Sequence, residues 1–237
     1  MAGEKTAFLV CSPRARSGKT VLSRALIDYL IVTSMEPWVF DTDIGEGELS
    51  SYFPDVSTIA DLDRVQGQMT LFDGLLGGYH QSYVVDIAQR QFEKFFDIVN
   101  DIDFIPEAEA AGLTLVVLMI VDSDPATVEK ALQMMRASPG PRYVVVRNEA
   151  CEGPEPPPEP VDPFVAIELA TAQLDVPKLD PVVYQFAEGA DFSLSAFLSD
   201  EPRSMSIVAR ARLRKWLHSF FDRLYSMQLT LDLSRQH

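Results

Sequence analysis

Short apolar runs alternate along the chain with stretches of helical periodicity. The unbroken runs, which are typical of strands buried on both faces, lie at 6–11, 38–40, 83–85, 113–121 and 143–147. The stretches in which apolar residues recur every three or four positions lie at 17–32, 88–99 and 125–135. Asp124 and Pro125 are a suitable N-cap and first position for the third of these helices. The alternation predicts an α/β fold with a doubly wound, mostly parallel sheet and helices on both faces, in a single domain over 1–237.

Five segments outside these runs carry their own patterns. Residues 149–163 are rich in proline and acidic side chains, which indicates an extended loop. We expect a helix over 164–174, and a short strand or the end of one over 176–179. Residues 67–80 contain an Asp-Gly pair and indicate a connection with a turn. Apolar and aromatic residues recur at helical spacing over 204–227, which predicts a long amphipathic C-terminal helix.

Composition and charge disfavour several classes of protein. The formal net charge of −15 disfavours non-specific DNA as a partner, because DNA binding depends on neutralising phosphates with Lys and Arg. The local basic cluster over 203–223 leaves DNA, an acidic protein or an anionic membrane open as partners. Cys11 and Cys151 form no disulfide framework, and we recognise no signal peptide or membrane span, so we expect a cytoplasmic protein. The three histidines lack metal-ligand spacing.

The segment CSPRARSGKT (11–20) ends like a phosphate-binding loop. Gly18-Lys19-Thr20 follows a predicted strand and opens a predicted helix, which is the context that such a loop requires. In a loop of this kind the lysine neutralises phosphate charge and the hydroxyl of the Ser/Thr holds Mg²⁺. The Walker A pattern asks for glycine where this chain has Pro13, so the loop departs from the standard form.

Three carboxylates follow predicted strands near this loop. Asp41 and Asp43 come after the strand at 38–40, and Asp86 ends the strand at 83–85. Phosphoryl chemistry needs carboxylates near the metal and the attacking water, and in a doubly wound sheet they come from the carboxyl ends of strands. Capping or solvation of a loop is the alternative interpretation of aspartates at such positions. Their grouping beside a Lys-Thr loop favours the catalytic interpretation.

At these residues the chain resembles the ParA/MinD family of deviant Walker A P-loop ATPases, of the SIMIBI class. SPRARSGKT (12–20) is similar to the loop SGKGGVGKT of MinD-like members, and Arg14 occupies the position of the family's signature lysine. FDTDIGEGELSSYF (40–53) resembles switch I, and YVVDIA (83–88) resembles the Walker B strand. IVDSDPATVEKALQMM (120–135) resembles the next strand–helix unit. The resemblance implies a P-loop NTPase fold that binds ATP and Mg²⁺.

The resemblance also implies roles for single residues. Its catalytic set is Asp43, which positions the attacking water, with Lys19 and Arg14, which reaches the nucleotide in the partner subunit of an ATP-bound homodimer. A guanidinium at Arg14 keeps the charge of the signature lysine and suits phosphate oxygens. The metal set is Thr20, Asp41 and Asp86. The nucleotide-binding set is Arg14, Ala15, Arg16, Ser17, Gly18, Lys19, Thr20, Val21, Asn148, which would read the adenine edge, and Pro177, which would pack beside the base.

Two departures from the family pattern bear on activity. Ala15 and Arg16 replace the two glycines after the signature lysine, where glycine lets the backbone approach phosphate or take a positive φ. The glycine expected in switch II after Asp86 is also missing, since the chain continues with Ile87, Ala88, Gln89 and Arg90. These departures predict a divergent and slow or inactive hydrolase.

The leading functional hypothesis is therefore a ParA/MinD-like ATPase switch that dimerises with ATP and positions a protein complex or DNA as cargo. The acidic charge favours a protein cargo. A nucleotide-binding scaffold without hydrolysis and a small-molecule ATP-dependent ligase of the dethiobiotin synthetase type are the alternatives. The absence of a guanine-binding motif favours adenine over guanine. The helix at 204–227 either docks on the sheet, which we favour, or makes peripheral contact with a membrane.

Overall fold

The computed structural model describes residues 5–44, 48–151, 169–187, 192–199 and 205–234. Within them, seven strands form one sheet in the order β3-β2-β4-β1-β5-β6-β7, and all neighbours pair in parallel. The strands are β1 (Lys5–Cys11), β2 (Trp38–Asp41), β3 (Ser57–Ile59), β4 (Ser82–Asp86), β5 (Leu113–Val121), β6 (Arg142–Asn148) and β7 (Ala172–Val176). The five unbroken apolar runs correspond to β1, β2, β4, β5 and β6, which form the buried centre of the sheet. Of the segment 176–179, only Val176 is in a strand, as the last residue of β7.

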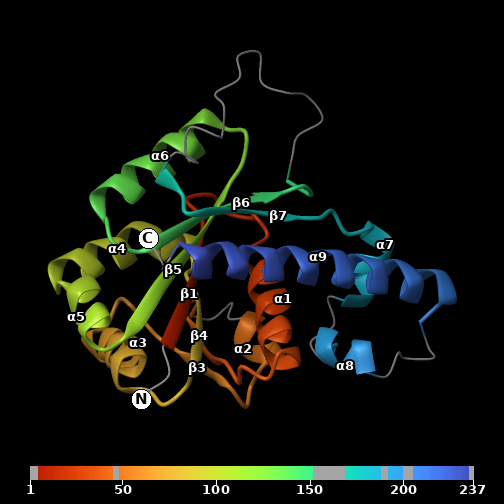
Figure 1. Cartoon of the computed structure of the whole chain (residues 1–237), viewed down its shortest axis with the longest axis horizontal. Helices are drawn as coiled ribbons and strands as arrows, with labels where there is room; N and C mark the ends of the chain where they lie inside the picture. Colours follow the sequence, from red (N-terminus) through yellow and green to blue (C-terminus); the bar gives the residue numbers. More distant parts are fainter. Residues whose placement is uncertain (1–4, 45–47, 152–168, 188–191, 200–204, 235–237) are drawn as a thin grey trace.

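Helices cover both faces of this sheet, as the sequence predicted (Figure 1). One face carries α1 (Lys19–Val32), α2 (Glu48–Tyr52), α7 (Pro181–Ala187), α8 (Leu194–Ser199) and α9 (Ile207–Leu233). The other carries α3 (Val65–Gly77), α4 (Phe92–Asp101), α5 (Phe104–Ala110) and α6 (Pro125–Ala137). A short 3-10 turn, η1 (Gln89–Gln91), leads into α4. Each layer has its own apolar core because strand side chains alternate between the two faces.

Helix α6 confirms the predicted cap. The Asp124 carboxylate accepts a hydrogen bond from the Ala126 N–H at 3.0 Å, and Pro125 occupies the first helical position. This removes one unpaired donor at the helix start, and proline needs no partner there. The helix therefore begins where the sequence indicates.

Helix α9 lies across one face of the sheet beside α1 (Figure 1). Its apolar stripe is buried in the core of that face, and Leu213, Leu217, Phe220 and Leu224 are wholly inaccessible to solvent. The favoured interpretation, docking on the sheet, is confirmed, and the helix is longer than the predicted 204–227. None of the helices in the described ranges is long and apolar enough to cross a membrane.

Two local predictions are wrong. The Asp73-Gly74 pair lies inside α3 and forms no turn; a Cβ on Gly74 would lie 2.8 Å from the Phe40 ring, so this glycine allows close packing. The helix expected over 164–174 is contradicted at its end, because residues 172–174 belong to β7, which pairs with β6. Sheet pairing outweighs local helical periodicity there. Most of the acidic loop predicted at 149–163 lies outside the described residues.

Candidate functional site

The candidate phosphate-binding loop connects the end of β1 to the start of α1. The Ser12 hydroxyl donates a hydrogen bond to the Ile120 carbonyl at 3.0 Å and accepts one from the Arg14 N–H at 3.2 Å, which ties the loop to the neighbouring strand β5. Gly18 has φ 87°, and a Cβ there would lie 2.2 Å from Asn148 Nδ2. Both the conformation and the space at position 18 therefore require glycine.

The start of α1 is suited to bind an anion. Its N-cap residue is Gly18, which has no side chain to cap the first N–H groups, and its first turn carries no acidic residue. Unpaired N–H groups and the helix dipole then favour a negative group at this end. Lys19 and Thr20 are the first two residues of the helix. Together they provide N–H donors, an ammonium and a hydroxyl, the groups that a nucleotide phosphate and its metal require.

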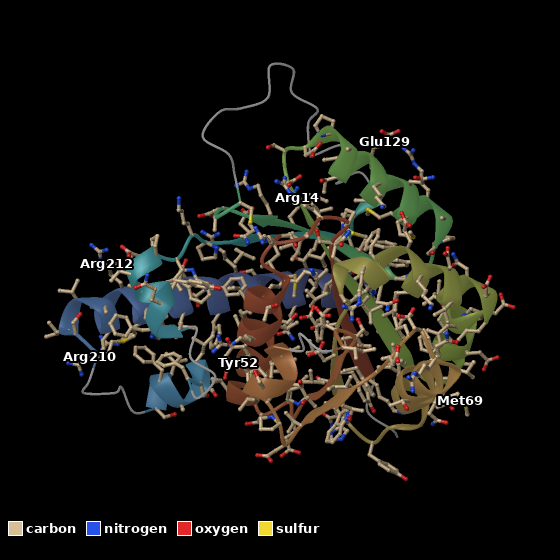
Figure 2. All side chains as sticks on the ribbon, turned by 180° about the vertical axis from the view of Figure 1, so that it is seen from behind. Arg14, Tyr52, Met69, Glu129, Arg210 and Arg212 are labelled. Carbon is tan, nitrogen blue, oxygen red and sulfur yellow. The ribbon has the colours of Figure 1, made fainter. Side chains whose placement is uncertain are left out.

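The two arginines of the loop differ from small residues, Arg16 in its backbone conformation and Arg14 in the ion pair of its side chain. Arg16 adopts φ 57°, in the left-handed region that glycine occupies without strain. The guanidinium of Arg14 makes an ion pair with the Asp122 carboxylate. Cys11 and Met119 are the last residues paired between β1 and β5, and Arg14 and Asp122 each follow three residues later. Figure 2 shows Arg14 at the edge of the molecule where α6 begins. In this structure Arg14 is thus held by its own chain.

A cavity of about 270 Å³ lies between this loop and the end of β5. Its lining comes from the loop, the end of β5, the start of α6 and the residues after β6: Ser12, Arg14, Ala15, Arg16, Ser17, Ile120, Val121, Asp122, Thr127 and Cys151. The volume is close to the lower limit of small-molecule pockets in proteins. The cavity extends the loop site toward α6.

The sheet brings Asp41 and Asp86 together, because they are direct partners in the register of β2 and β4. Asp86 is only 8% exposed, and within the described residues its Oδ1 atom has no hydrogen-bond partner. Burial raises the pKa of the Asp86 carboxyl to about 7, and the nearby Lys19 ammonium opposes that rise. An incompletely paired buried carboxylate beside Lys19 fits a place next to a bound cation.

Asp41 has a different environment from Asp86. Its Oδ1 atom accepts a hydrogen bond from the Asp43 N–H at 2.9 Å, and its Oδ2 atom accepts one from the Ser50 N–H at 3.2 Å. Burial raises the pKa of this carboxyl, while these N–H groups lower it. Asp41 therefore shapes the turn that carries Asp43, and its oxygens are already bonded.

Asp43 makes an ion pair with Arg90, since Nη2 of the arginine lies 3.1 Å from Oδ1 of the aspartate. The same nitrogen donates a hydrogen bond to the Ile44 carbonyl at 3.2 Å. The sequence analysis noted Arg90 only as part of a stretch that lacks glycine, and it missed this contact. The sequence does show a cation, Arg90, four residues beyond Asp86, but it does not show which acidic side chain that cation contacts.

Asn148 and Pro177, which were predicted to contact the base, make hydrogen bonds within the chain in this structure. Asn148 Nδ2 donates to the Ser17 carbonyl at 2.9 Å, and its Oδ1 atom accepts from the Ala150 N–H at 3.0 Å. Its side chain therefore supports the loop in this structure. The Pro177 carbonyl accepts a hydrogen bond from Trp216 Nε1 at 2.6 Å, so α9 anchors the segment after β7.

Of the other predicted site residues, Val21 lies in the first turn of α1 and packs against the core, and Ala15 is exposed on the loop. The described residues include no group of three or more His, Cys, Asp or Glu that could hold a metal ion. This composition still fits Mg²⁺ in a nucleotide complex, because Mg²⁺ takes few protein ligands and shares phosphate oxygens and water. Thr20 would be the ligand, and Asp41 and Asp86 would support its water shell.

Comparisons with known proteins identify the fold. No family model and no curated protein matches the sequence. Among solved structures, the chain is similar to the MinC:MinD cell division protein complex of Aquifex aeolicus, with 12% identity, a TM-score of 0.52, and 90% of this chain and 96% of that chain covered. The septum site-determining protein MinD complexed with Mg-ADP, from Pyrococcus horikoshii, is 12% identical and has a TM-score of 0.52; the match covers 90% of this chain and 95% of that chain. A ParA family ATPase from Chlorobium tepidum is 9% identical and has a TM-score of 0.52; the match covers 92% of this chain and 98% of that chain.

The chain thus has the α/β P-loop NTPase fold of the MinD and ParA-family ATPases. Because the identity is so low, the similarity establishes the fold and leaves the chemistry to the site.

Proposed function

We propose that this protein is a nucleotide-dependent switch of the ParA/MinD kind, which binds ATP with Mg²⁺ and hydrolyses it slowly. The observation that carries the proposal is the loop at 12–20, which opens α1 without a side-chain cap and lies beside the carboxylates at the ends of β2 and β4. The fold of the structural neighbours, one of them complexed with Mg-ADP, supports the same assignment.

In this proposal the first turn of α1 and the Lys19 ammonium bind the phosphates. Thr20, Asp41 and Asp86 would hold Mg²⁺, which would neutralise the phosphate charge. Asp43 orients the attacking water. The water oxygen bonds to the γ-phosphorus while the bond to the bridging oxygen breaks, which yields ADP, phosphate and one proton released to solvent. Lys19 stabilises the charge that develops on the phosphate oxygens.

We propose further that ATP stabilises a homodimer in which Arg14 leaves Asp122 and contacts the nucleotide of the partner subunit. The ion pair between Arg14 and Asp122 would compete with that contact. The net charge of −15 favours a protein cargo over non-specific DNA. The buried apolar stripe of α9 disfavours insertion of this helix into a membrane.

The test is the mass of the protein in solution with Mg²⁺ and ATP, ADP or no nucleotide. The natural chain, Lys19→Ala and Asp43→Ala would be measured by light scattering, with thermal unfolding alongside. Ligand at 100 times its Kd should add about 2.7 kcal/mol of stability. We expect a dimer only with ATP, its persistence in Asp43→Ala, and loss of binding and dimer in Lys19→Ala. A monomer that ATP does not stabilise would refute the proposal.

A second candidate is a nucleotide-binding scaffold without hydrolysis, and one observation favours it. The residues after Asp86 are tied down, since the Ala88 N–H donates to the Thr42 hydroxyl at 2.8 Å and Gln89 Nε2 donates to the Pro13 carbonyl at 3.2 Å. A segment held this way moves less readily between nucleotide states than one with glycine. Binding of ATP by the natural chain without release of phosphate would select the scaffold.

A further inference from the structure

The segment that follows Asp86 joins the loop at 12–20 to the residues after β2. Thr42 links it to β4, because its hydroxyl donates to the Asp86 carbonyl at 3.1 Å and accepts from the Ala88 N–H at 2.8 Å. Gln89 reaches the loop through the Pro13 carbonyl. Arg90 reaches the other side, where it contacts Asp43 and the Ile44 carbonyl. Arg90 is therefore placed by contacts on both sides of it.

The two carboxylate oxygens of Asp43 differ in their surroundings. Oδ1 is inaccessible to solvent, makes no hydrogen bond within the described residues, and lies 3.1 Å from the Arg90 guanidinium. No described residue donates a hydrogen bond to Oδ2, and the side chain as a whole is 36% exposed. The guanidinium thus balances the charge on the buried oxygen and leaves the other oxygen able to accept a hydrogen bond from water.

A buried carboxylate oxygen without a partner is costly, so the ion pair restricts the orientation of Asp43. The Arg90 side chain is itself restrained, because its Nη2 atom also donates a hydrogen bond to the carbonyl of Ile44, the residue after Asp43. The Arg90 side chain as a whole is 48% exposed. This arrangement orients a carboxylate through one oxygen, as outer partners of metal ligands do in other enzymes.

We propose that Arg90 is a positioning residue for hydrolysis, which anchors Oδ1 of Asp43 so that Oδ2 accepts the hydrogen bond of the attacking water. This inference rests on the proposed function and adds to it a residue that acts only through Asp43. The opposite role would be a latch, in which Arg90 withholds Asp43 from water. The observed contact with the buried oxygen alone supports positioning.

The test compares Arg90→Gln and Arg90→Lys with the natural chain, using Mg²⁺ and ATP, and takes Arg136→Gln as control. Arg136 is an exposed arginine in the last turn of α6, outside the candidate site. We expect Arg90→Gln to lower kcat by about 10-fold or more while KM changes less than about twofold, as for other outer partners of catalytic groups. Arg90→Lys should recover part of kcat, and Arg136→Gln should match the natural chain.

A double-mutant cycle tests whether Arg90 acts through Asp43. On an Asp43→Asn background, Arg90→Gln should cause no further loss of kcat, because the group that it positions is already disabled. A readout that needs no turnover is amide exchange in the nucleotide-free protein. Arg90→Gln should speed exchange at the amides of Asp43 and Ile44 and leave those of α6 unchanged.

The outcomes separate this inference from the proposed function. Suppose that the natural chain hydrolyses ATP. If Arg90→Gln is then as active as the natural chain or more active, the positioning role is wrong and the switch stands. The same holds if Arg90→Gln lowers kcat as much on the Asp43→Asn background as on the natural one. ATP binding without hydrolysis in the natural chain also overturns the positioning role. If the natural chain binds no ATP, the proposed function fails and this inference fails with it.

Discussion

Removal of the Asp86 carboxylate should change how the stability of the nucleotide-free protein depends on pH. Asp86 is buried at the end of β4, and burial raises its pKa from 3.8 to about 7. Between these two values the folded protein keeps a proton that the unfolded chain has lost. Stability therefore falls as pH rises through this range, and the loss is complete above the folded pKa.

The size of the effect follows from the two pKa values. Each pKa unit corresponds to about 1.4 kcal/mol, so raising the pH from 5 to 8 crosses two units and should cost about 3 kcal/mol. Asp86→Asn cannot lose a proton and should lack this component. The free energy of unfolding of the natural chain should accordingly fall by about 3 kcal/mol relative to Asp86→Asn over that range.

The assay is urea unfolding of both proteins in EDTA, followed by tryptophan fluorescence at several pH values from 5 to 8. Lys19→Met should extend the fall to higher pH for the natural carboxylate, because the Lys19 ammonium opposes the rise of the Asp86 pKa. Parallel pH profiles for the natural chain and Asp86→Asn would refute the reasoning. A natural chain that gains stability relative to Asp86→Asn as pH rises would show that attraction to Lys19 outweighs burial.

Three further predictions concern the loop and α9, each measured by urea unfolding. Arg16→Gly should be more stable than Arg16→Ala by about 0.5 to 1 kcal/mol, because φ 57° strains any residue with a Cβ; equal stabilities would contradict this. Gly18→Ala should cost about 2 kcal/mol or more, since its Cβ would lie 2.2 Å from Asn148 Nδ2 at φ +87°, and a neutral result would mean that the asparagine moves aside freely. Leu213→Ala should cost about 3 kcal/mol, whereas Tyr225→Ala, at a position 57% exposed, should change stability by less than about 0.5 kcal/mol; similar effects would argue against docking of the α9 stripe.

Much of the fold could be predicted from the sequence because the signals are local. Unbroken apolar runs correspond to the central strands β1, β2, β4, β5 and β6. The cap at Asp124 and the start of α1 after Gly18 depend on neighbouring residues only. The short elements β3, α2 and α5 carry too few residues for a periodic pattern and were not predicted.

The candidate site divides in the same way. The loop at 12–20 and the aspartates after β2 and β4 were predicted from their positions relative to apolar runs, and the parallel register places Asp41 beside Asp86. The turn predicted at the Asp-Gly pair in α3 is wrong because the glycine instead allows close packing against Phe40, a residue distant in the sequence. Local turn preference has no means to detect such a contact.

The sequence by itself determined the α/β architecture, the loop that opens α1 and the acids placed at strand ends, since all three depend on residues close together in the chain. Only the tertiary structure decided the partners of the charged groups. Arg14 pairs with Asp122, and Arg90 pairs with Asp43 across two strands of the sheet. Likewise, the sequence pattern of the apolar face of α9 is the same for a helix that docks on a sheet and for one that enters a membrane, and only the structure shows it in the core. Which charge meets which, and what covers an apolar face, depend on the packing of segments distant in sequence.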